Sequence, residues 1–334
     1  MQRARLAIRL GLPLAAALAA AACGDDDARD AADVVEVADV AGEDLGGEST
    51  PDAAGDRPDG GEEDAALPDG PPDALGDASE DRPPADEVSD AADTSDVSSG
   101  IWRPAPGTRW QWQLTGTIDD SLDVEMYDID LFEAPQAVID GLRARGVVVI
   151  CYFSAGSREE WREDAGDFPA AAVGEPLDGW PGERWLDIRS PDVRRIMQAR
   201  LDRAVARRCD GVEPDNVDAY ANDSGFPLIA AHQLDYNRFL AAEAHARGLS
   251  VGLKNDLEQV EDLLADFDWA LNEECFQWDE CDLLRPFVVA GKAVFQVEYG
   301  DAGLAGTICP RANALDFDTL IKRLDLDAWR IPCR

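Results

Sequence analysis

Short apolar runs recur along residues 101–334, and most are rich in the β-branched and aromatic residues that favour strands. Turn residues or helical patterns separate one run from the next. The pattern predicts eight strands, at residues 110–114, 125–131, 147–153, 211–215, 250–255, 269–275, 293–299 and 328–331.

Between these runs, apolar residues recur at the helical period. One such segment follows Ser190, which suits an N-cap, and has Pro191 at its first position; another ends at Gly248, a favoured C-cap residue. The pattern predicts helices over residues 135–145, 191–208, 230–247, 257–266, 283–290 and 317–324.

Strands that alternate with helices predict a parallel sheet covered by helices, which is an α/β fold. Eight strands in one segment of this length fit a (β/α)8 TIM barrel better than an open doubly wound sheet. No Gly-x-Gly-x-x-Gly and no P-loop follow the early strands, so the common reasons to expect a nucleotide-binding open sheet are missing. We therefore predict one (β/α)8 barrel domain at residues 101–334.

The first residues have a different pattern. Arg3, Arg5 and Arg9 precede a short Ala/Leu-rich run and then Cys23, which is the layout of an export signal. Residues 1–22 resemble a bacterial lipoprotein signal peptide, in which Cys23 is lipidated and becomes the new N-terminus. The usual Leu three positions before the Cys is Ala20 here. An ordinary secretory signal is the alternative.

Residues 23–100 lack Phe, Trp and Tyr, and residues 24–100 hold 26 acidic and three basic residues. Such a segment cannot bury enough apolar surface to fold, so we predict a disordered, extended tether. The Asp-rich spacing shows no EF-hand loop for calcium. Together these features predict an exported lipoprotein held on a lipid bilayer, periplasmic or at the cell surface, or else a secreted protein.

Charge and composition exclude several functions. The chain has a net charge of -39 and two histidines, His232 and His245, in one predicted helix. A nucleic-acid partner requires a basic footprint that is missing. A Ser-His-Asp hydrolase or a His-ligated zinc site requires histidine at the site.

The six cysteines after Cys23 are an even number in a predicted exported protein, which indicates disulfides. Local spacing favours the pairs Cys275–Cys281 and Cys309–Cys333. Cys151 and Cys209 either form a third bridge or remain reduced and buried.

Carboxylates end five of the predicted strands, and in a barrel these ends form the rim that carries the active site. Acidic residues at buried strand ends cost desolvation free energy, so as a set they indicate a functional site. Two facing carboxylates near aromatic residues are the arrangement of a glycosidase. Aromatic residues near these ends, any of which can instead be core, are Tyr152, Trp161, Tyr220, Phe276, Trp278 and Tyr299.

Six motifs in order along the domain resemble those of glycoside hydrolase family 114, the endo-α-1,4-polygalactosaminidase family. They are Trp-Gln-Trp-Gln-Leu from Trp110, Tyr-Asp-Ile-Asp from Tyr127, Cys-Tyr-Phe-Ser-Ala-Gly from Cys151, Asp-Gly-Val-Glu-Pro-Asp-Asn-Val-Asp from Asp210, Gly-Leu-Lys-Asn-Asp from Gly252, and Asn-Glu-Glu-Cys-Phe from Asn272.

The resemblance implies a (β/α)8 barrel that cleaves α-1,4-linked galactosamine-rich polymers with retention of configuration. It places the catalytic carboxylates at Asp215 and Glu273. By analogy with α-galactosidase-like barrels, Asp215 on strand four is the nucleophile and Glu273 on strand six the general acid/base; the exchanged roles remain open. The mechanism needs neither a metal nor an organic cofactor.

A further set of residues near the same rim is predicted to bind substrate or to orient the catalytic pair: Asp128, Asp130, Tyr152, Glu213, Asn216, Asp218, Lys254, Asp256, Glu298 and Tyr299. Glu213 shares the strand parity of Asp215 and should lie one layer deeper. The expected partner is a cationic, partly deacetylated galactosamine polymer attracted to an acidic cleft, and we expect a monomer. Two alternatives remain: a tethered barrel that binds polysaccharide without turnover, and a glycosidase on a different α-linked polymer.

Overall fold

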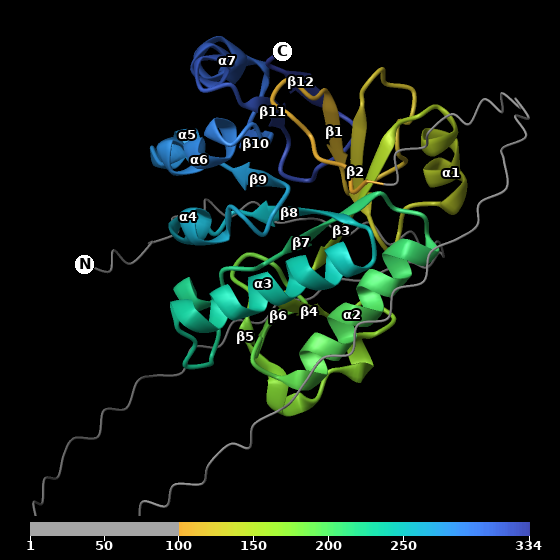
Figure 1. The fold of residues 1–334 in the computed structure, drawn as a ribbon, viewed down its shortest axis with the longest axis vertical. Coiled ribbons are helices and arrows are strands. Elements are labelled where there is room, and N and C mark those ends of the chain that lie inside the picture. The colour runs from red at the N-terminus through yellow and green to blue at the C-terminus, as the bar shows by residue number, and fades with distance from the viewer. Residues whose placement is uncertain (1–99) are drawn as a thin grey trace, which may run out of the picture. The chain divides into compact units, whose positions relative to one another are not determined.

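The structure is a computed structural model that describes residues 100–334. The predicted signal peptide, Cys23 and all of the predicted tether before Gly100 lie outside the described residues. Eight parallel strands form a nearly closed barrel with helices around its outside (Figure 1). The prediction of an α/β TIM barrel is confirmed. The strands are β1 (Trp110–Gln113), β2 (Met126–Asp130), β3 (Val148–Ser154), β7 (Gly211–Asp215), β8 (Ser250–Lys254), β9 (Trp269–Glu273), β10 (Val294–Tyr299) and β11 (Asp318–Lys322).

The barrel wall separates two apolar clusters. The inner cluster fills the barrel and includes Trp110, Trp112, Trp269 and Phe295, whereas the outer one lies between strands and helices. Inside, Gly252 has no room for a side chain, because a Cβ there would lie 2.3 Å from the Trp269 ring. This packing is the alternation expected when successive side chains of a strand point to opposite faces.

The helices are α1 to α7, at Gln136–Ala144, Pro191–Ala206, Ala230–Ala246, Val260–Leu263, Cys275–Trp278, Arg285–Val289 and Ala305–Ala314. The predicted start of α2 at Pro191 is confirmed, and Gly248 after α3 has the left-handed backbone (φ +75°) that glycine adopts most easily. The predicted helices at 257–266 and 283–290 are shorter, since each begins with a 3₁₀ turn. Among residues 100–334, no helix is long and apolar enough to cross a bilayer.

The end of the domain corrects the sequence interpretation. Residues 317–324, predicted as a helix, contain the eighth barrel strand β11, whose five residues are all buried. The predicted strand at 328–331 is instead β12 (Arg330–Pro332), which pairs antiparallel with β11. The helix α7 was not predicted, because Gly306 and Pro310 disfavour one. A five-residue strand that is buried on both faces and mixes polar with apolar residues has no period that separates strand from helix.

Residues between β3 and α2 form a second, three-stranded antiparallel sheet that the sequence did not predict. It consists of β4 (Ser157–Glu159), β5 (Val173–Pro176) and β6 (Glu183–Leu186), with β6 in the middle. We call it the inserted sheet. Because it follows the C-terminal end of β3, it lies at the rim that carries the predicted site.

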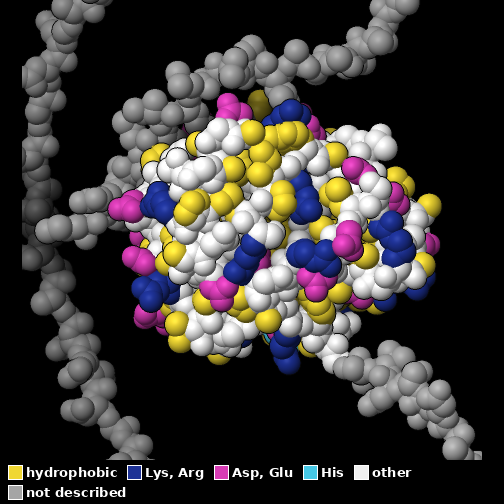
Figure 2. Space-filling view, turned by 90° about the horizontal axis from the view of Figure 1, so that it is seen from above, with side chains coloured by type: hydrophobic (Ala, Val, Ile, Leu, Met, Phe, Trp, Pro, Cys, Tyr) yellow, Lys and Arg dark blue, Asp and Glu magenta, His cyan; other side chains and the backbone are white. Residues whose placement is uncertain are grey.

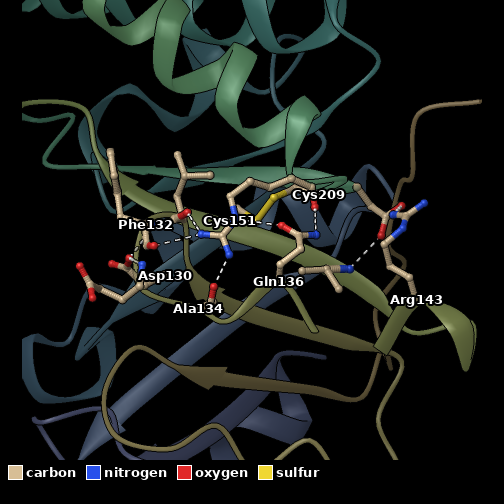
Figure 3. Close-up of a disulfide and its surroundings, with 12 residues drawn as sticks. Asp130, Phe132, Ala134, Gln136, Arg143, Cys151 and Cys209 are labelled. Atoms are coloured by element: carbon tan, nitrogen blue, oxygen red, sulfur yellow. Dashed lines mark hydrogen bonds and ion pairs between the residues drawn. A yellow bond between two sulfur atoms is a disulfide. The ribbon is translucent and has the colours of Figure 1, made fainter. Parts of the chain in front are cut away.

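All six domain cysteines are paired. The bridges Cys275–Cys281 and Cys309–Cys333 confirm the prediction, and Cys151–Cys209 forms the third. This third bridge ties β3 to the residues before β7 (Figure 3). Nearby, Arg207 donates to the carbonyl groups of Leu131, Phe132 and Ala134, so the segments before α1 and β7 are held together.

Candidate active site

The ammonium group of Lys254 lies among three carboxylates at the C-terminal ends of β7 and β9. Its Nζ is 2.9 Å from Glu213 Oε1, 3.2 Å from Asp215 Oδ1 and 3.4 Å from Glu273 Oε2. The Lys254 side chain is 2% exposed, and the Trp112 ring centroid lies 4.7 Å from Nζ. One buried cation thus bridges the two predicted catalytic carboxylates.

The depth of each carboxylate follows from strand parity. Glu213 and Asp215 are two residues apart on β7, so both point into the barrel. The Glu213 side chain is fully buried, whereas those of Asp215 and Glu273 are 19% and 26% exposed. Glu213 lies deeper, as predicted, and only Asp215 and Glu273 of these three are open to a substrate.

Three donors hold the Asp215 carboxylate. Asn216 N–H donates to Oδ1 at 2.7 Å, Tyr152 Oη–H donates to Oδ2 at 3.0 Å, and Lys254 is the third. Burial, with the nearby Asp215 charge, raises the pKa of Tyr152 well above its usual value. The phenol therefore stays protonated and remains a donor, which fixes the orientation of Asp215.

Glu273 is held in a similar way from the other side. Tyr299 Oη–H donates to Oε1, and Asn255 Nδ2 donates to Oε2 at 3.2 Å. Asn255 Oδ1 also accepts from Glu273 N at 3.0 Å. Burial raises the pKa of Tyr299 well above its usual value, so this phenol also remains a donor.

Sequence reasoning assigned no role to Asn255, although it noted the Lys-Asn-Asp run. Asn255 has a left-handed backbone, with φ +50°. Asn tolerates this conformation better than most residues. The sequence feature that could have indicated a role for Asn255 is its place directly after a barrel strand, at the rim that carries the site. The contact of Trp112 with the Lys254 ammonium group was also not predicted, because an aromatic residue inside a strand is equally typical of the hydrophobic core.

Asp128 and Glu213 form an acidic pair below the catalytic carboxylates. Among the described residues, no group outside this pair donates a hydrogen bond to either oxygen of Asp128 or to Glu213 Oε2, so the two carboxyl groups are left to pair with each other. Burial, with the charge of Glu213, raises the pKa of Asp128 well above its usual range, and burial raises that of Glu213 to about 7 despite Lys254. Asp128 is therefore the protonated partner and donates to Glu213.

This proton limits the charge of the site. With Asp128 neutral and Lys254 charged, three carboxylates share one cation above about pH 7, the pKa of Glu213. Below that pH the protonation of Glu213 leaves Asp215 and Glu273 with Lys254. Among residues 100–334, no group of three or more His, Cys, Asp or Glu side chains is arranged to hold a metal ion.

The structure gives other predicted residues partners within the protein. Asp130 accepts two hydrogen bonds from the Arg162 guanidinium, and Glu298 is 4% exposed and accepts from Phe276 N–H. Asp256 accepts from Asn237 Nδ2 at 2.8 Å, and burial, with the charge of Asp218, raises its pKa to about 8. Asp130, Glu298, Asp256 and Asp218 are not within the group around Lys254, and their role as sugar ligands stays a prediction.

The shared contact with Lys254 limits the distance between the two catalytic candidates. Asp215 Oδ1 and Glu273 Oε2 are separated by no more than the sum of their distances to Nζ, 3.2 and 3.4 Å. Inverting glycosidases place their carboxyl groups about 6.5–9.5 Å apart and retaining ones about 5–5.5 Å apart. Two carboxyl groups whose nearest oxygens share one ammonium group are compatible with the retaining arrangement.

The chain is similar to known glycoside hydrolases in both sequence and fold. The model of glycoside-hydrolase family GH114 matches residues 91–334. The crystal structure of Aspergillus fumigatus Ega3 in complex with galactosamine is similar to the chain, with 43% sequence identity and a TM-score of 0.68; the match covers 70% of this chain and 98% of that one.

Two further relatives are more distant. The glycoside hydrolase domain of PelA from Pseudomonas aeruginosa has 12% identity and a TM-score of 0.53, over 67% of this chain and 96% of that one, which shows a shared fold only. An uncharacterized protein of Deinococcus radiodurans is 28% identical over 254 residues, which is 65% of this chain and 81% of that protein.

Proposed function

Because the chain belongs to glycoside-hydrolase family GH114, we propose that it cleaves internal α-1,4 linkages of a galactosamine-rich polysaccharide by a retaining mechanism. The observation that carries the proposal is the pair Asp215 and Glu273, bridged by Lys254 and open to solvent. The similarity to Ega3, which was crystallised with galactosamine, supports an amino sugar as the substrate.

In the proposed reaction, an Asp215 oxygen attacks the anomeric carbon while Glu273 donates a proton to the glycosidic oxygen. The bond from the anomeric carbon to the leaving oxygen breaks, and a covalent glycosyl ester of Asp215 forms. Glu273 then removes a proton from water, which attacks the anomeric carbon and releases Asp215. Each carboxylate returns to its starting state.

Local charge supports a cationic substrate. Above about pH 7, Asp215 and Glu213 outnumber Lys254 even while Glu273 holds the proton that it donates, so the ammonium group of a deacetylated sugar would offset the remaining negative charge. Figure 2 shows Lys/Arg and Asp/Glu side chains interspersed on one outer face of the domain.

The direct test measures release of reducing ends from a deacetylated α-1,4-galactosamine polymer by the full chain. Asp215→Asn and Glu273→Gln should each reduce kcat by at least about 10³-fold while polymer binding persists. Glu274→Gln, next to Glu273, is the matched control and should keep near-normal turnover. Binding by all variants without release of reducing ends from any α-linked polymer would favour a binding barrel instead.

The two roles are separable by chemistry. With an activated substrate, azide should rescue a side-chain-deleted Asp215→Ala variant and give a product of inverted configuration. Azide rescue of Glu273→Ala should give a product of retained configuration, because the covalent intermediate still forms on Asp215. The opposite pattern would exchange the two roles.

We also propose that the protein is exported and held on a lipid bilayer through Cys23, with residues 24–100 as a tether. The signal-like residues 1–22 support this placement, and so do three disulfides in the domain, which are typical of exported proteins. Metabolic labelling with a fatty acid tests it: label should appear on the wild-type chain and be lost in Cys23→Ala. Label retained in Cys23→Ala would refute the anchor.

A further inference from the structure

The inserted sheet brings a buried carboxylate, Glu183, close to the catalytic centre. Glu183 begins β6 and is 7% exposed. Its Oε2 accepts a hydrogen bond from Ser157 Oγ at 2.6 Å, on the neighbouring strand β4. Nothing in the pattern of the sequence marked either residue, and neither faces an open cleft.

A chain of hydrogen bonds continues from Ser157 to the loop after β7. Ser154 Oγ lies 2.6 Å from Ser157 Oγ, and it accepts from Ser157 N–H at 3.1 Å and from Asn216 Nδ2 at 2.8 Å. A hydroxyl oxygen has two acceptor sites and one proton. Because two N–H groups fill both acceptor sites of Ser154, its proton is donated to Ser157, whose own proton is donated to Glu183.

Asn216 connects this chain of hydrogen bonds to Asp215. Its backbone N–H donates to Asp215 Oδ1 at 2.7 Å, and its backbone is left-handed with φ +60°. The segment is tightly enclosed: a Cβ on Gly156 would lie 1.7 Å from Asn216 O. Asn216 is therefore held at one end by Ser154 and at the other holds the proposed nucleophile.

From this chain we propose that Glu183 is a positioning residue for catalysis, which orients Asp215 through Ser157, Ser154 and Asn216. The inference rests on the proposed glycosidase function, since it concerns the nucleophile of that reaction. Glu183 itself touches no substrate. As the final acceptor, it takes the Ser157 proton and so completes the order that the N–H groups impose on the two serine hydroxyls.

The strength of this effect depends on the charge of Glu183. A hydrogen bond to an ionised acceptor is roughly twice as strong as one to a neutral acceptor. Burial, with the charges of Glu159 on β4 and Asp215 on β7, raises the pKa of Glu183 to about 7, while Ser157 and Arg162 oppose the shift. Glu183 is thus neutral at pH 5, where its carbonyl oxygen still accepts from Ser157, and ionised at pH 8.

Two variants give different pH signatures. Glu183→Gln keeps a neutral acceptor of the same shape, so its kcat should match wild type at pH 5 and be about tenfold lower at pH 8. Ser157→Ala breaks the chain at every pH and should lower kcat at both. Since the two residues act in one chain, the double variant should be no worse than Ser157→Ala alone.

Glu159→Gln is the matched control, because Glu159 is a buried carboxylate of the same inserted sheet. It pairs with Arg162 at 2.8 Å and Arg200 at 3.6 Å and is not part of the hydrogen-bond chain from Glu183 to Asp215. It should lower the Tm and, because it removes a charge that raises the pKa of Glu183, move the pH dependence of kcat to lower pH without the loss of kcat at pH 8. A Glu183→Gln enzyme with wild-type kcat at pH 8, or with the same loss at both pH values, would overturn the proposal.

A readout independent of turnover separates this inference from the proposed function. Hydrogen exchange of the Asn216 backbone amide, measured at pH 8 on the full chain, should be faster in Glu183→Gln and Ser157→Ala and unchanged in Glu159→Gln. If wild type hydrolyses no polymer but this exchange pattern holds, the proposed function fails and the hydrogen-bond chain stands. If the wild type hydrolyses the polymer but the exchange rate of the Asn216 amide is unchanged in all three variants, the hydrogen-bond chain is refuted and the proposed function stands.

Discussion

Replacing Lys254 by Met tests the electrostatic organisation of the site most directly. The substitution keeps an unbranched side chain of similar length but removes the only cation in contact with Glu213, Asp215 and Glu273 among the described residues. The three carboxylates then repel one another in a buried environment without compensation. Glu213 titrates beside Asp215 and its pKa depends on Lys254, so the effect of the substitution should appear first in the pH dependence of kcat/KM.

The magnitude follows from the geometry. At 3.2 Å and an effective dielectric constant of about 20, the attraction between Lys254 and Asp215 is on the order of 5 kcal/mol before desolvation is subtracted. A neighbouring opposite charge typically makes a carboxyl group easier to ionise by about 1–3 pH units. Lys254 lowers the pKa of Glu213, so in Lys254→Met the acidic limb of kcat/KM that follows the ionisation of Glu213 should move to higher pH by about 1–3 units.

Stability should change in the same variant. Removing one partner of a buried ion pair costs about 3–5 kcal/mol when the remaining charge stays buried. Lys254 lowers the pKa of Glu213, which is about 7 in the wild type, so in the variant Glu213 relieves this cost by taking up a proton, and that uptake becomes less favourable as the pH rises. The Tm of Lys254→Met should thus fall more at pH 8 than at pH 5.

The assay is kcat/KM against pH on soluble galactosamine oligomers, with thermal unfolding at both pH values. Lys292→Met is the control, because Lys292 is a partly buried lysine that donates to the carbonyls of Leu264 and Phe267 far from the three carboxylates. It should lower the Tm without moving the acidic limb. An acidic limb of Lys254→Met at the wild-type pH would refute the reasoning.

Three further predictions follow from single features. Gly156→Ala should lower kcat by at least about 10²-fold, because its Cβ would lie 1.7 Å from Asn216 O. Gly141→Ala in α1 is the control and should be neutral or slightly stabilising, because open space surrounds that position. Measurements of kcat and Tm check both variants. Burial raises the pKa of Asp256 to about 8, so the folded state holds a proton that the unfolded state releases near pH 4. The free energy of unfolding therefore falls as the pH rises from about 4 to 8. Asp256→Asn should raise the Tm at pH 9 and leave it nearly unchanged at pH 4. Removing Cys151–Cys209, which spans 58 residues, should cost about 4 kcal/mol in unfolding free energy, against about 2 kcal/mol for Cys275–Cys281, as measured by denaturant titration.

Strong local signals explain where the sequence predicted the fold well. The first seven barrel strands and helices α1, α2 and α3 combine an apolar period with caps such as Pro191 and Gly248. The Asp-Asn and Asn-Glu motifs at the ends of β7 and β9 place Asp215 and Glu273 on one rim, because all parallel strands of a barrel point the same way. The strand parity of Glu213 and Asp215 was likewise readable from their spacing.

Contacts between distant residues explain what the sequence left open. The run at 318–322 was misread because its burial on both faces comes from its neighbours, β10 and β12, and not from its own pattern. Asp130 and Asp215 look alike in the sequence, yet one pairs with Arg162 and the other with Lys254.

The sequence by itself determined the barrel and its rim, since periodicity and strand direction are local properties of the chain, and its resemblance to a known family pointed to Asp215 and Glu273 as the proposed catalytic carboxylates. Only the tertiary structure decided how those carboxylates are charged and held. The proton between Asp128 and Glu213, the position of Lys254 and the chain from Glu183 to Asp215 each join residues far apart in sequence. Burial and distance set their strength, and neither exists until the strands have closed around them.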